Sequence, residues 1–580
     1  MAPSSSSGRR RGPACIPGLL AATSAPPQES GPAPQKSRHD SGPTSPSETL
    51  AIRNSSTRAA ALILGIATVV HIALALHLPL APDETYYWEW SRNLSWGYYD
   101  QGPLIAWWIR AFCAVAGDTA LGIRIGVIVA GLATRALIWR LADELYGPRA
   151  ALIALVLSSV TPLSLIGSII ATYDPVMALF WAAACLFAAR AVRTGSPSAW
   201  LALGLAFGLG LLAKHTMALF AVGFVAYLLL RPERRMWLGR KEPWLAAALG
   251  LSLFAPNLVW QSQHHWMTFE HITHLTGRGD GGPLKLAGQF VGGQALLLTP
   301  ILFVAMVYAL GWATRRAAKP DGDPEAFVVC MALPTLVLFF LASFRSTVQG
   351  NWPAAGWLTP PIAYAAWLTS RRGPRPPDSS GAAAAPIDGR WANWMLRAGI
   401  ALSLFVCIAA AVPELRPVLH IHLAKKADHM RVLFGGPELA AAVDRERKAL
   451  EARTHRPVAV GAATYDTVSR LSFYLPGQPR AYCFFLNTRA NSYLLFNERN
   501  RLAPGADAIV ADDQPPGDPR LPHFADIFAR VEPVATPVPI LRPDMYPEPA
   551  RVYYLYRCYG YRPGQPAERP ADEGGLAAKR

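Results

Sequence analysis

The chain is short of charge. Only 16% of its 580 residues are Asp, Glu, Lys or Arg, whereas a soluble protein of this size has about a quarter. Hydrophobic residues make up 52% of the chain, and its mean hydropathy is +0.20. These values exclude a soluble, disordered or fibrous structure for the apolar part of the chain.

Motifs of nucleotide-using and serine enzymes are also missing. There is no GxGxxG after a predicted strand, no P-loop with a lysine and no GxSxG elbow, so a nucleotide-activated substrate is not indicated. The net charge of +16 does not predict nucleic-acid binding, because the basic residues lie mainly in short loops between apolar segments.

Long apolar runs are abundant between residues 59 and 413. Each has the length that a helix needs to cross about 30 Å of hydrocarbon. We therefore predict a polytopic, mainly α-helical membrane domain over residues 58–413, with about eleven transmembrane helices. The predicted spans are 59–80, 120–140, 150–170, 175–192, 199–213, 215–230, 244–261, 287–312, 325–344, 353–369 and 395–413.

Loop charge predicts the orientation. Residues 1–57 are rich in Ser, Pro, Gly and Ala without apolar periodicity, which is typical of a disordered tail. If this tail is cytoplasmic, the inside loops carry about three times as many Lys and Arg residues as the outside loops, as the positive-inside rule requires.

Residues 414–580 differ in character. Turn signals such as Pro476-Gly477 separate short β-branched runs from a helical pattern near 438–453, which predicts a small extracytoplasmic α/β domain with a parallel or mixed sheet. Cys483 and Cys558 both lie in this domain. An oxidising compartment would allow a disulfide between them, and two buried free thiols are the alternative.

The first outer loop, residues 81–119, is unusually aromatic. Apolar residues recur in it at helical spacing, which predicts two amphipathic helices in the membrane interface. An aromatic belt would account for the rings but not for Asp83 and Glu84, two adjacent carboxylates directly after the first span.

Further polar residues are predicted on the same face. Asp174 precedes Pro175 and is either an ordinary helix start or a second carboxylate beside Asp83. Lys214 lies between two apolar runs, where it either snorkels or binds phosphate. The later outer loops contribute His264, Arg278 and Arg345.

This combination predicts a pocket that opens at lipid depth. Carboxylates with aromatic rings suit a sugar, and interfacial cations suit a lipid phosphate or pyrophosphate. We expect Asp83, Asp174 and Lys214 to meet in one cleft. Because the adjacent His264 and His265 lack the spacing of metal ligands, the sequence specifies no cofactor and leaves a divalent cation open.

At these residues the sequence resembles a known family. The run from Asp83 through Tyr98, Tyr99 and Asp100 to Pro103-Leu104 is similar to the first-loop signature of bacterial GT-C glycosyltransferases, the relatives of protein O-mannosyltransferases and of the lipid A aminoarabinose transferase. Tyr173-Asp174-Pro175, Lys214, the run from Asn257 to Phe269 and Asn351-Trp352-Pro353 follow in the same order. One departure is that many relatives have a basic residue where Gln101 follows Asp100 here.

The resemblance implies transfer of a sugar from a polyprenyl-phosphate carrier to an extracytoplasmic glycan, lipid A-type lipid or protein, with inversion. It implies a multi-pass protein of the bacterial inner membrane, without nucleic-acid partners. Asp83 would be the catalytic base, and Glu84 and Asp174 would orient the sugars. The remaining implied substrate ligands are Tyr98, Tyr99, Asp100 and His264 in the pocket, with Lys214 and Arg278 or Arg345 at the leaving phosphate.

Two other classes of function stay open on sequence alone. A transporter or flippase of lipid-linked sugars would have inverted repeats and ionisable residues near the bilayer midplane. A non-catalytic assembly factor would have little use for paired acidic sites.

Overall fold

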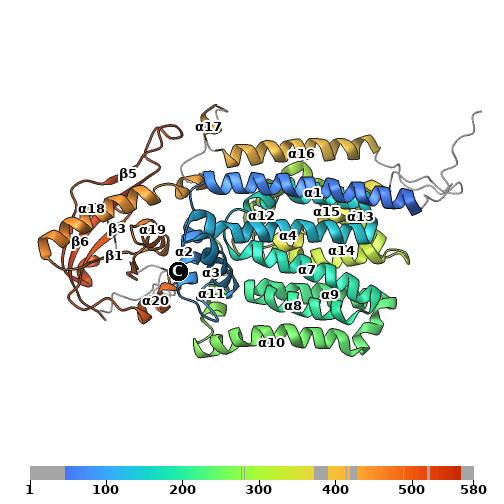
Figure 1. The fold of residues 1–580 in the computed structure, drawn as a ribbon, viewed down its shortest axis with the longest axis horizontal. Helices are drawn as coiled ribbons and strands as arrows, with labels where there is room; N and C mark the ends of the chain where they lie inside the picture. Colours follow the sequence, from blue (N-terminus) through green and yellow to red (C-terminus); the bar gives the residue numbers. More distant parts are fainter. Residues whose placement is uncertain are drawn as a thin grey trace, which may run out of the picture. The chain divides into compact units, whose positions relative to one another are not determined.

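The fold was analysed in a computed structural model of the chain. It describes residues 46–563 except 276, 278, 280, 371–388, 413, 419–427, 487–488, 519–520 and 522. Most of the described chain is helical (Figure 1).

Long apolar helices make up the membrane part. Among the described residues, six helices are long and apolar enough to cross a membrane, or up to eight if each of two bent helix pairs is one span. The six are α1 (Pro46–His77), α4 (Ala120–Tyr146), α7 (Tyr173–Thr194), α10 (Lys241–Gln263), α14 (Asp323–Ala342) and α16 (Gly389–Ala411). The chain is therefore a multi-pass membrane protein, as its hydropathy predicts.

Shorter apolar helices lie among the long ones, so length and composition alone do not yield the predicted eleven spans. They are α5 (Pro148–Val160), α8 (Pro197–Ala213) and α15 (Pro360–Ser370). α8 packs between α7 and α10, and α15 packs against α5 and α13 (Pro300–Ala317). The bent pair of α9 (Ala218–Leu230) and the 3-10 helix η2 (Pro232–Gly239) turns by 119°.

The predicted span 287–312 is wrong as one straight helix. The structure breaks it into α12 (Pro283–Leu298) and α13, which meet at 104°. Thr299 adopts a positive φ of 66°, and Pro300 follows it. Because the residue before a proline is kept out of the helical region, the helix ends there and restarts at Pro300.

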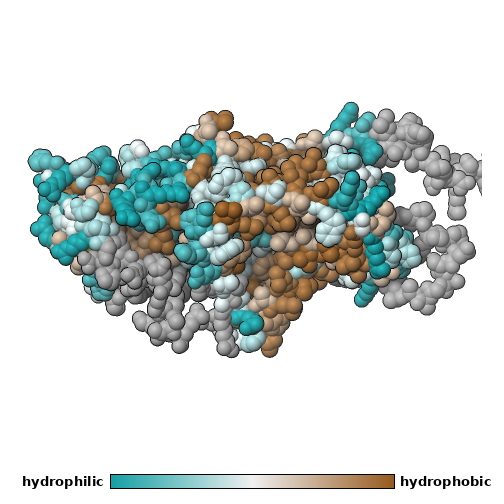
Figure 2. Space-filling view, turned by 90° about the horizontal axis from the view of Figure 1, so that it is seen from below, coloured by the Kyte–Doolittle hydropathy of each residue, from teal (hydrophilic) through white to brown (hydrophobic). Residues whose placement is uncertain are grey.

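The surface agrees with a membrane-embedded bundle. Figure 2 shows an apolar band over the helical part, with hydrophilic surface on either side of it. The exposed large apolar side chains of the helical part include Leu62, Val69 and Leu76 of α1, which are 65%, 67% and 67% exposed. Such side chains are stable in this position when lipid covers them.

Two helices occupy the first loop, as predicted. They are α2 (Pro82–Arg92) and α3 (Leu104–Ala116). The expectation that both lie on the membrane surface is wrong for α2, whose residues 84–91 are all buried. α2 is covered by α3 and by α19 (Tyr465–Tyr474) of the C-terminal part, so its rings pack inside the protein. Trp88 and Trp90, for example, are 1% and 0% exposed.

The C-terminal α/β region (436–561) contains a mixed sheet. Its strand order is β2-β1-β3-β6-β4, with β5 also paired to β6. β1 is parallel to β2 and β3, and β6 is antiparallel to β3, β4 and β5. The strands are β1 (Val458–Ala462), β2 (Tyr482–Cys483), β3 (Asp507–Asp512), β4 (Phe528–Pro533), β5 (Val538–Ile540) and β6 (Arg551–Tyr561).

Short helices complete this region and the loops around it. The helices of the region are α18 (Gly436–Thr454), α19, α20 (Tyr493–Arg499) and η5 (Phe524–Asp526). The remaining helices of the described chain are α6 (Pro162–Ile166), η1 (His215–Met217), α11 (Met267–Leu275), η3 (Ala354–Trp357), α17 (Leu415–Val418) and η4 (His429–Leu433). α19 follows β1 and packs on α2, which places the carboxyl end of β1 beside the first loop.

Cys483 and Cys558 are both buried and free. They lie on β2 and β6, which β1 and β3 separate in the sheet. Three strand spacings of about 4.8 Å exceed the Cα separation of about 7 Å that a disulfide can bridge, so the alternative of two buried thiols holds.

Candidate active site

Asp83 lies where two cavities meet. The first, which we call the bundle cavity, has a volume of about 440 Å³ and is lined by residues of α4, α5, α7 and α13 together with Asp83, Asp174 and Asn351. The second, the sheet-side cavity, has about 800 Å³ and is lined by the end of β1, the start of α19, Arg489 and Asp83. A carboxylate at this junction is accessible to molecules bound in either cavity.

The local sequence explains why Asp83 lies in the first turn of a helix. Pro82 occupies the first position of α2, where its missing N–H costs no hydrogen bond, and Asp83 and Glu84 follow in the first turn. Acidic groups are favourable there because the helix dipole is positive at its N-terminus. Asp83 is exposed to the cavities, whereas the next side chain, Glu84, is 0% exposed.

The surroundings of Asp83 tune its ionisation. The enclosing protein and the carboxylate of Asp100 raise the pKa of Asp83 above its usual value. A hydrogen bond of 3.3 Å from the hydroxyl of Tyr465 and the charge of Arg489 act in the opposite direction and lower this pKa. A raised carboxylate pKa is what a general base needs to accept a proton near neutral pH.

Asp100 lies beside the carboxylate of Asp83 but is buried. Its Oδ2 accepts a 2.6 Å hydrogen bond from the Tyr86 hydroxyl and a 3.4 Å hydrogen bond from Ser492 Oγ. Its Oδ1 accepts a 2.5 Å hydrogen bond from Arg489 and lies 3.6 Å from Nε2 of His271. Asp100 therefore joins the first loop to the C-terminal α/β region.

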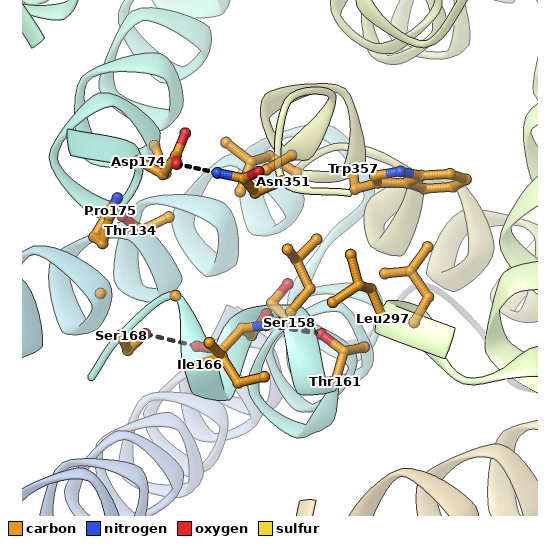
Figure 3. A pocket seen from close by; sticks show the side chains of 18 of the residues that line it. Thr134, Ser158, Thr161, Ile166, Ser168, Asp174, Pro175, Leu297, Asn351 and Trp357 are labelled. Carbon is orange, nitrogen blue, oxygen red and sulfur yellow. Dashed lines mark hydrogen bonds between the residues drawn. The ribbon is translucent and has the colours of Figure 1, made fainter. Parts of the chain in front are cut away.

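A second polar cluster surrounds Asp174. Its Oδ1 accepts a 2.6 Å hydrogen bond from Lys214 Nζ, and its Oδ2 accepts a 2.7 Å hydrogen bond from Asn351. Figure 3 shows Asn351 pointing toward Asp174 at the edge of the bundle cavity. The helix start accounts for the position of Asp174 but not for its contacts, since the N-cap of α7 is Thr172.

Of the expected convergence of Asp83, Asp174 and Lys214 in one cleft, the structure shows the two carboxylates in one cavity and Lys214 against Asp174, outside the lining of that cavity. Lys214 neither snorkels nor stands free for a phosphate, because its side chain is 3% exposed and already neutralised by a carboxylate. Its ammonium also lies 4.9 Å from the ring centroid of Tyr173.

The structure contradicts the predicted role of Glu84 in orienting a sugar. Both of its oxygens bind Arg124, at 2.8 and 2.6 Å, and they also accept hydrogen bonds from the backbone N–H groups of Ala81 and Ala171. With no exposed surface left, its side chain cannot touch a sugar. Glu84 instead ties the start of α2 to α4 and to the segment before α7.

Two tyrosines and a histidine are packing residues as well. Tyr98 is 0% exposed, stacks on Trp90 at 4.1 Å and hydrogen-bonds to backbone carbonyls, so it does not line a pocket. Tyr99 is buried against His271. His264 stacks on Trp260 at 4.0 Å. Tyr98 and Tyr99 pack inside because the C-terminal α/β region covers them through Phe496 and Ser492, whereas His264 is half-buried.

Of the two predicted loop arginines, the structure describes only Arg345. Arg345 is exposed and belongs to the lining of neither cavity. Arg278 lies outside the described residues. In the described part of the chain, no group of three or more His, Cys, Asp or Glu side chains is arranged to hold a metal ion.

Sequence reasoning missed four residues that shape the site: Arg124, Arg135, Tyr465 and Arg489. The first two carry a recognisable signal, because an arginine within an apolar span needs a partner or a function. Arg135 lines the bundle cavity, where its Nη2 contacts His71 and Ser168. Tyr465 and Arg489 carry no such signal, since they lie in a different part of the sequence from Asp83.

Comparison with known proteins agrees with this architecture. Residues 100–260 match the family described as dolichyl-phosphate-mannose-protein mannosyltransferase. The fold matches the apo crystal structure of ArnT from Cupriavidus metallidurans with a TM-score of 0.56 and 16% identity, covering 86% of this chain and 98% of that one. The resemblance to bacterial GT-C glycosyltransferases is confirmed.

Two curated relatives are similar in sequence. The chain is 28% identical over 296 residues to the lipid A galacturonosyltransferase RgtD of Rhizobium johnstonii, covering 50% of this chain and 61% of the relative. It is 26% identical over 292 residues to the undecaprenyl phosphate-alpha-4-amino-4-deoxy-L-arabinose arabinosyl transferase of Erwinia tasmaniensis, covering 47% and 52%. The matched stretch thus spans about half to three fifths of each relative.

Proposed function

We propose that the chain is a GT-C glycosyltransferase that moves a sugar from a polyprenyl-phosphate donor to an extracytoplasmic glycan, lipid A-type lipid or protein. The observation that carries this proposal is the position of Asp83 at the junction of two cavities. The bundle cavity, with apolar residues such as Leu297 and Trp357 beside Asp174, suits a donor that combines a lipid and a sugar. The sheet-side cavity, whose lining includes the charged side chains of Asp83, Asp466 and Arg489, suits a hydroxylated acceptor.

The proposed reaction is a single displacement. Asp83 accepts the proton of an acceptor hydroxyl, and the hydroxyl oxygen forms a bond to the anomeric carbon of the donor sugar. The bond from that carbon to the phosphate oxygen breaks, and its electron pair leaves on the carrier phosphate. Attack from the face opposite the leaving group inverts the anomeric carbon. Asp174, held by Lys214 and Asn351, orients hydroxyl groups of the sugar.

The relatives favour a transferase over a flippase, because both are named for sugar transfer and one of them for an undecaprenyl-phosphate sugar. ArnT from Cupriavidus metallidurans also has a structure bound to undecaprenyl phosphate, with the same fold as this chain. A flippase would move the donor across the membrane without making a new glycosidic bond.

The decisive assay uses the purified full-length protein, a synthetic polyprenyl-phosphate sugar and lipid A as acceptor. Asp83→Asn keeps the shape of the side chain but removes the base, so transfer should fall about 100-fold or more. Asp526→Asn, the same change at an exposed site in η5, should leave the rate unchanged. Asp83→Asn activity within a few fold of the parent protein would contradict the assigned base.

The proposed topology has eleven crossings. They are the six long helices together with α5, α8, α9, α13 and α15, while α12 bends away from the bundle at Thr299. With a cytoplasmic N-terminus, this number places Asp83 and an extracytoplasmic domain of residues 414–580 outside a bacterial inner membrane. The basic loops inside support this orientation.

Cysteine labelling in cells tests the topology. Leu94 is 50% exposed in the loop between α2 and α3, so Leu94→Cys in a Cys15→Ser background should react with a membrane-impermeant maleimide added from outside. Asp321→Cys, between α13 and α14, should react only after the membrane is opened. The reverse pattern would contradict the proposed orientation.

A further inference from the structure

Departure of a lipid phosphate calls for a cation that is free to bind it. Charge develops on the leaving oxygen in the transition state, and a positioned guanidinium or ammonium stabilises that charge. Lys214 and Arg124 are poor candidates, because each is already paired with a carboxylate at 2.6 Å and their side chains are 3% and 2% exposed. Directly after Asp100 the first loop has the uncharged Gln101.

Arg489 differs from these cations in being accessible. It precedes α20 in the C-terminal α/β region, its side chain is 45% exposed, and it lines the sheet-side cavity together with Asp83. Only its Nη2 atom is engaged, by Asp100 at 2.5 Å and by a contact of 3.4 Å with His271 Nε2. Within the described chain, Nε and Nη1 have no hydrogen-bond acceptor, so the N–H groups of these two atoms remain available, each on a different edge of the guanidinium.

The guanidinium is held close to the base. Its carbon lies 5.8 Å from the ring centroid of Tyr465, and the hydroxyl of that same ring donates to Asp83 at 3.3 Å. The charge of Arg489 also lowers the pKa of Asp83, as expected of a neighbouring cation. A group bound to the free N–H groups of Arg489 would therefore lie within reach of the reacting atoms.

Asp100 fixes the orientation of this arginine. The Tyr86 hydroxyl and Ser492 Oγ hold the second oxygen of the Asp100 carboxylate, so the carboxylate cannot rotate freely. Because the carboxylate engages one nitrogen, the N–H groups of Nε and Nη1 can still donate charge-assisted hydrogen bonds to the oxygens of an anion. The ion pair of Arg489 and Asp100 therefore holds the guanidinium in place and leaves it donors with which to bind an anion.

We propose that Arg489 binds a phosphate group of a substrate in the sheet-side cavity, which makes the C-terminal α/β region part of the active site. The proposal rests on the proposed function. The phosphate belongs either to the polyprenyl carrier, where Arg489 would take up the charge left by the breaking sugar–phosphate bond, or to a phosphorylated acceptor. Both sources present the same chemistry to the guanidinium.

Two binding measurements on the full-length protein in detergent distinguish the sources. The probes are undecaprenyl phosphate and lipid A, the latter compared with its dephosphorylated form. Arg489→Gln should weaken binding of at least one phosphate probe about tenfold or more, as expected for loss of a charge-assisted contact. Loss confined to undecaprenyl phosphate assigns the donor, and loss confined to phosphorylated lipid A assigns the acceptor.

Three further variants separate phosphate binding from a structural effect. Arg489→Lys keeps the charge but not the planar donors, so it should recover part of the affinity that Arg489→Gln loses, whereas Arg456→Gln, at an exposed arginine outside both cavities, should change binding of neither probe. Asp100→Asn weakens the contact that orients Arg489 but keeps the cation, so it should weaken phosphate binding clearly less than Arg489→Gln does. If Asp100→Asn instead weakens binding as much as Arg489→Gln does, the role of Arg489 is structural and the proposal is overturned.

The proposal also fails if Arg489→Gln binds both probes within twofold of the parent protein. Such a result leaves the proposed function standing if Asp83→Asn still abolishes sugar transfer. Full activity of Asp83→Asn would count against the proposed function instead, so the two failures are distinguishable.

Discussion

Breaking the pair of Glu84 and Arg124 should destabilise the protein strongly. The two side chains are 0% and 2% exposed, with Nη2 and Oε2 2.6 Å apart. Glu84→Gln preserves the shape but leaves a buried guanidinium without its counter-charge. Loss of one partner of a buried ion pair costs about 3–5 kcal/mol in free energy of unfolding. The upper part of this range applies here, because the amide NH₂ of Gln would face the donors of Arg124.

A double-mutant cycle isolates the interaction. Arg124→Gln should cost a similar amount, because Glu84 would keep its charge and only the two backbone donors. The double variant contains no buried charge and should be more stable than the sum of the single effects by about 2 kcal/mol or more. Unfolding is followed by SDS titration of the protein in bicelles.

A second ion pair provides the matched control. Arg557 and Glu446 also approach to 2.6 Å, but their side chains are 26% and 24% exposed. The same substitutions there should show a coupling below about 1 kcal/mol, because water screens the charges. An equally small coupling for Glu84 and Arg124 would refute the structural role. A large rise in KM with unchanged stability would restore Glu84 as a substrate ligand.

Three other outcomes are expected. Tyr465→Phe removes a hydrogen bond that lowers the pKa of Asp83, so the pH below which kcat/KM falls should move upward by up to about one unit in a pH–rate profile. Asp174→Asn leaves the buried Lys214 without its partner and should cost about 3 kcal/mol of unfolding free energy, visible as a lower Tm. Burial raises the pKa of Asp512 from 3.8 to about 6, so folding stability falls as the pH rises from about 4 to about 6 and stays lower above it, and Asp512→Asn should raise Tm at pH 7.5 but leave it nearly unchanged at pH 3.

Much of the fold can be predicted from long runs of apolar residues. An apolar stretch of about 20 residues has no stable place outside a membrane or a core, so the crossing segments can be read from hydropathy. Where local chemistry interrupts such a run, the prediction fails. The segment 287–312 is uncharged throughout, yet Thr299-Pro300 divides it into two helices at 104°.

The residues of the candidate site also fall into two groups, those that the sequence predicts and those that only the packing of the helices explains. Asp83 and Asp174 could be named from sequence because each begins a helix next to an apolar segment, which places it at the membrane surface. Glu84 also begins a helix next to an apolar segment, but its side chain binds Arg124 instead of facing a cavity. Which of the two it does depends on how α4 packs beside α2. The sequence alone determined the polytopic class and the acidic start of α2, because both depend on neighbouring residues. Only the tertiary structure decided the partners of Lys214, Glu84 and Arg489, because a contact between segments far apart in the chain leaves no spacing that a reader of the sequence can recognise.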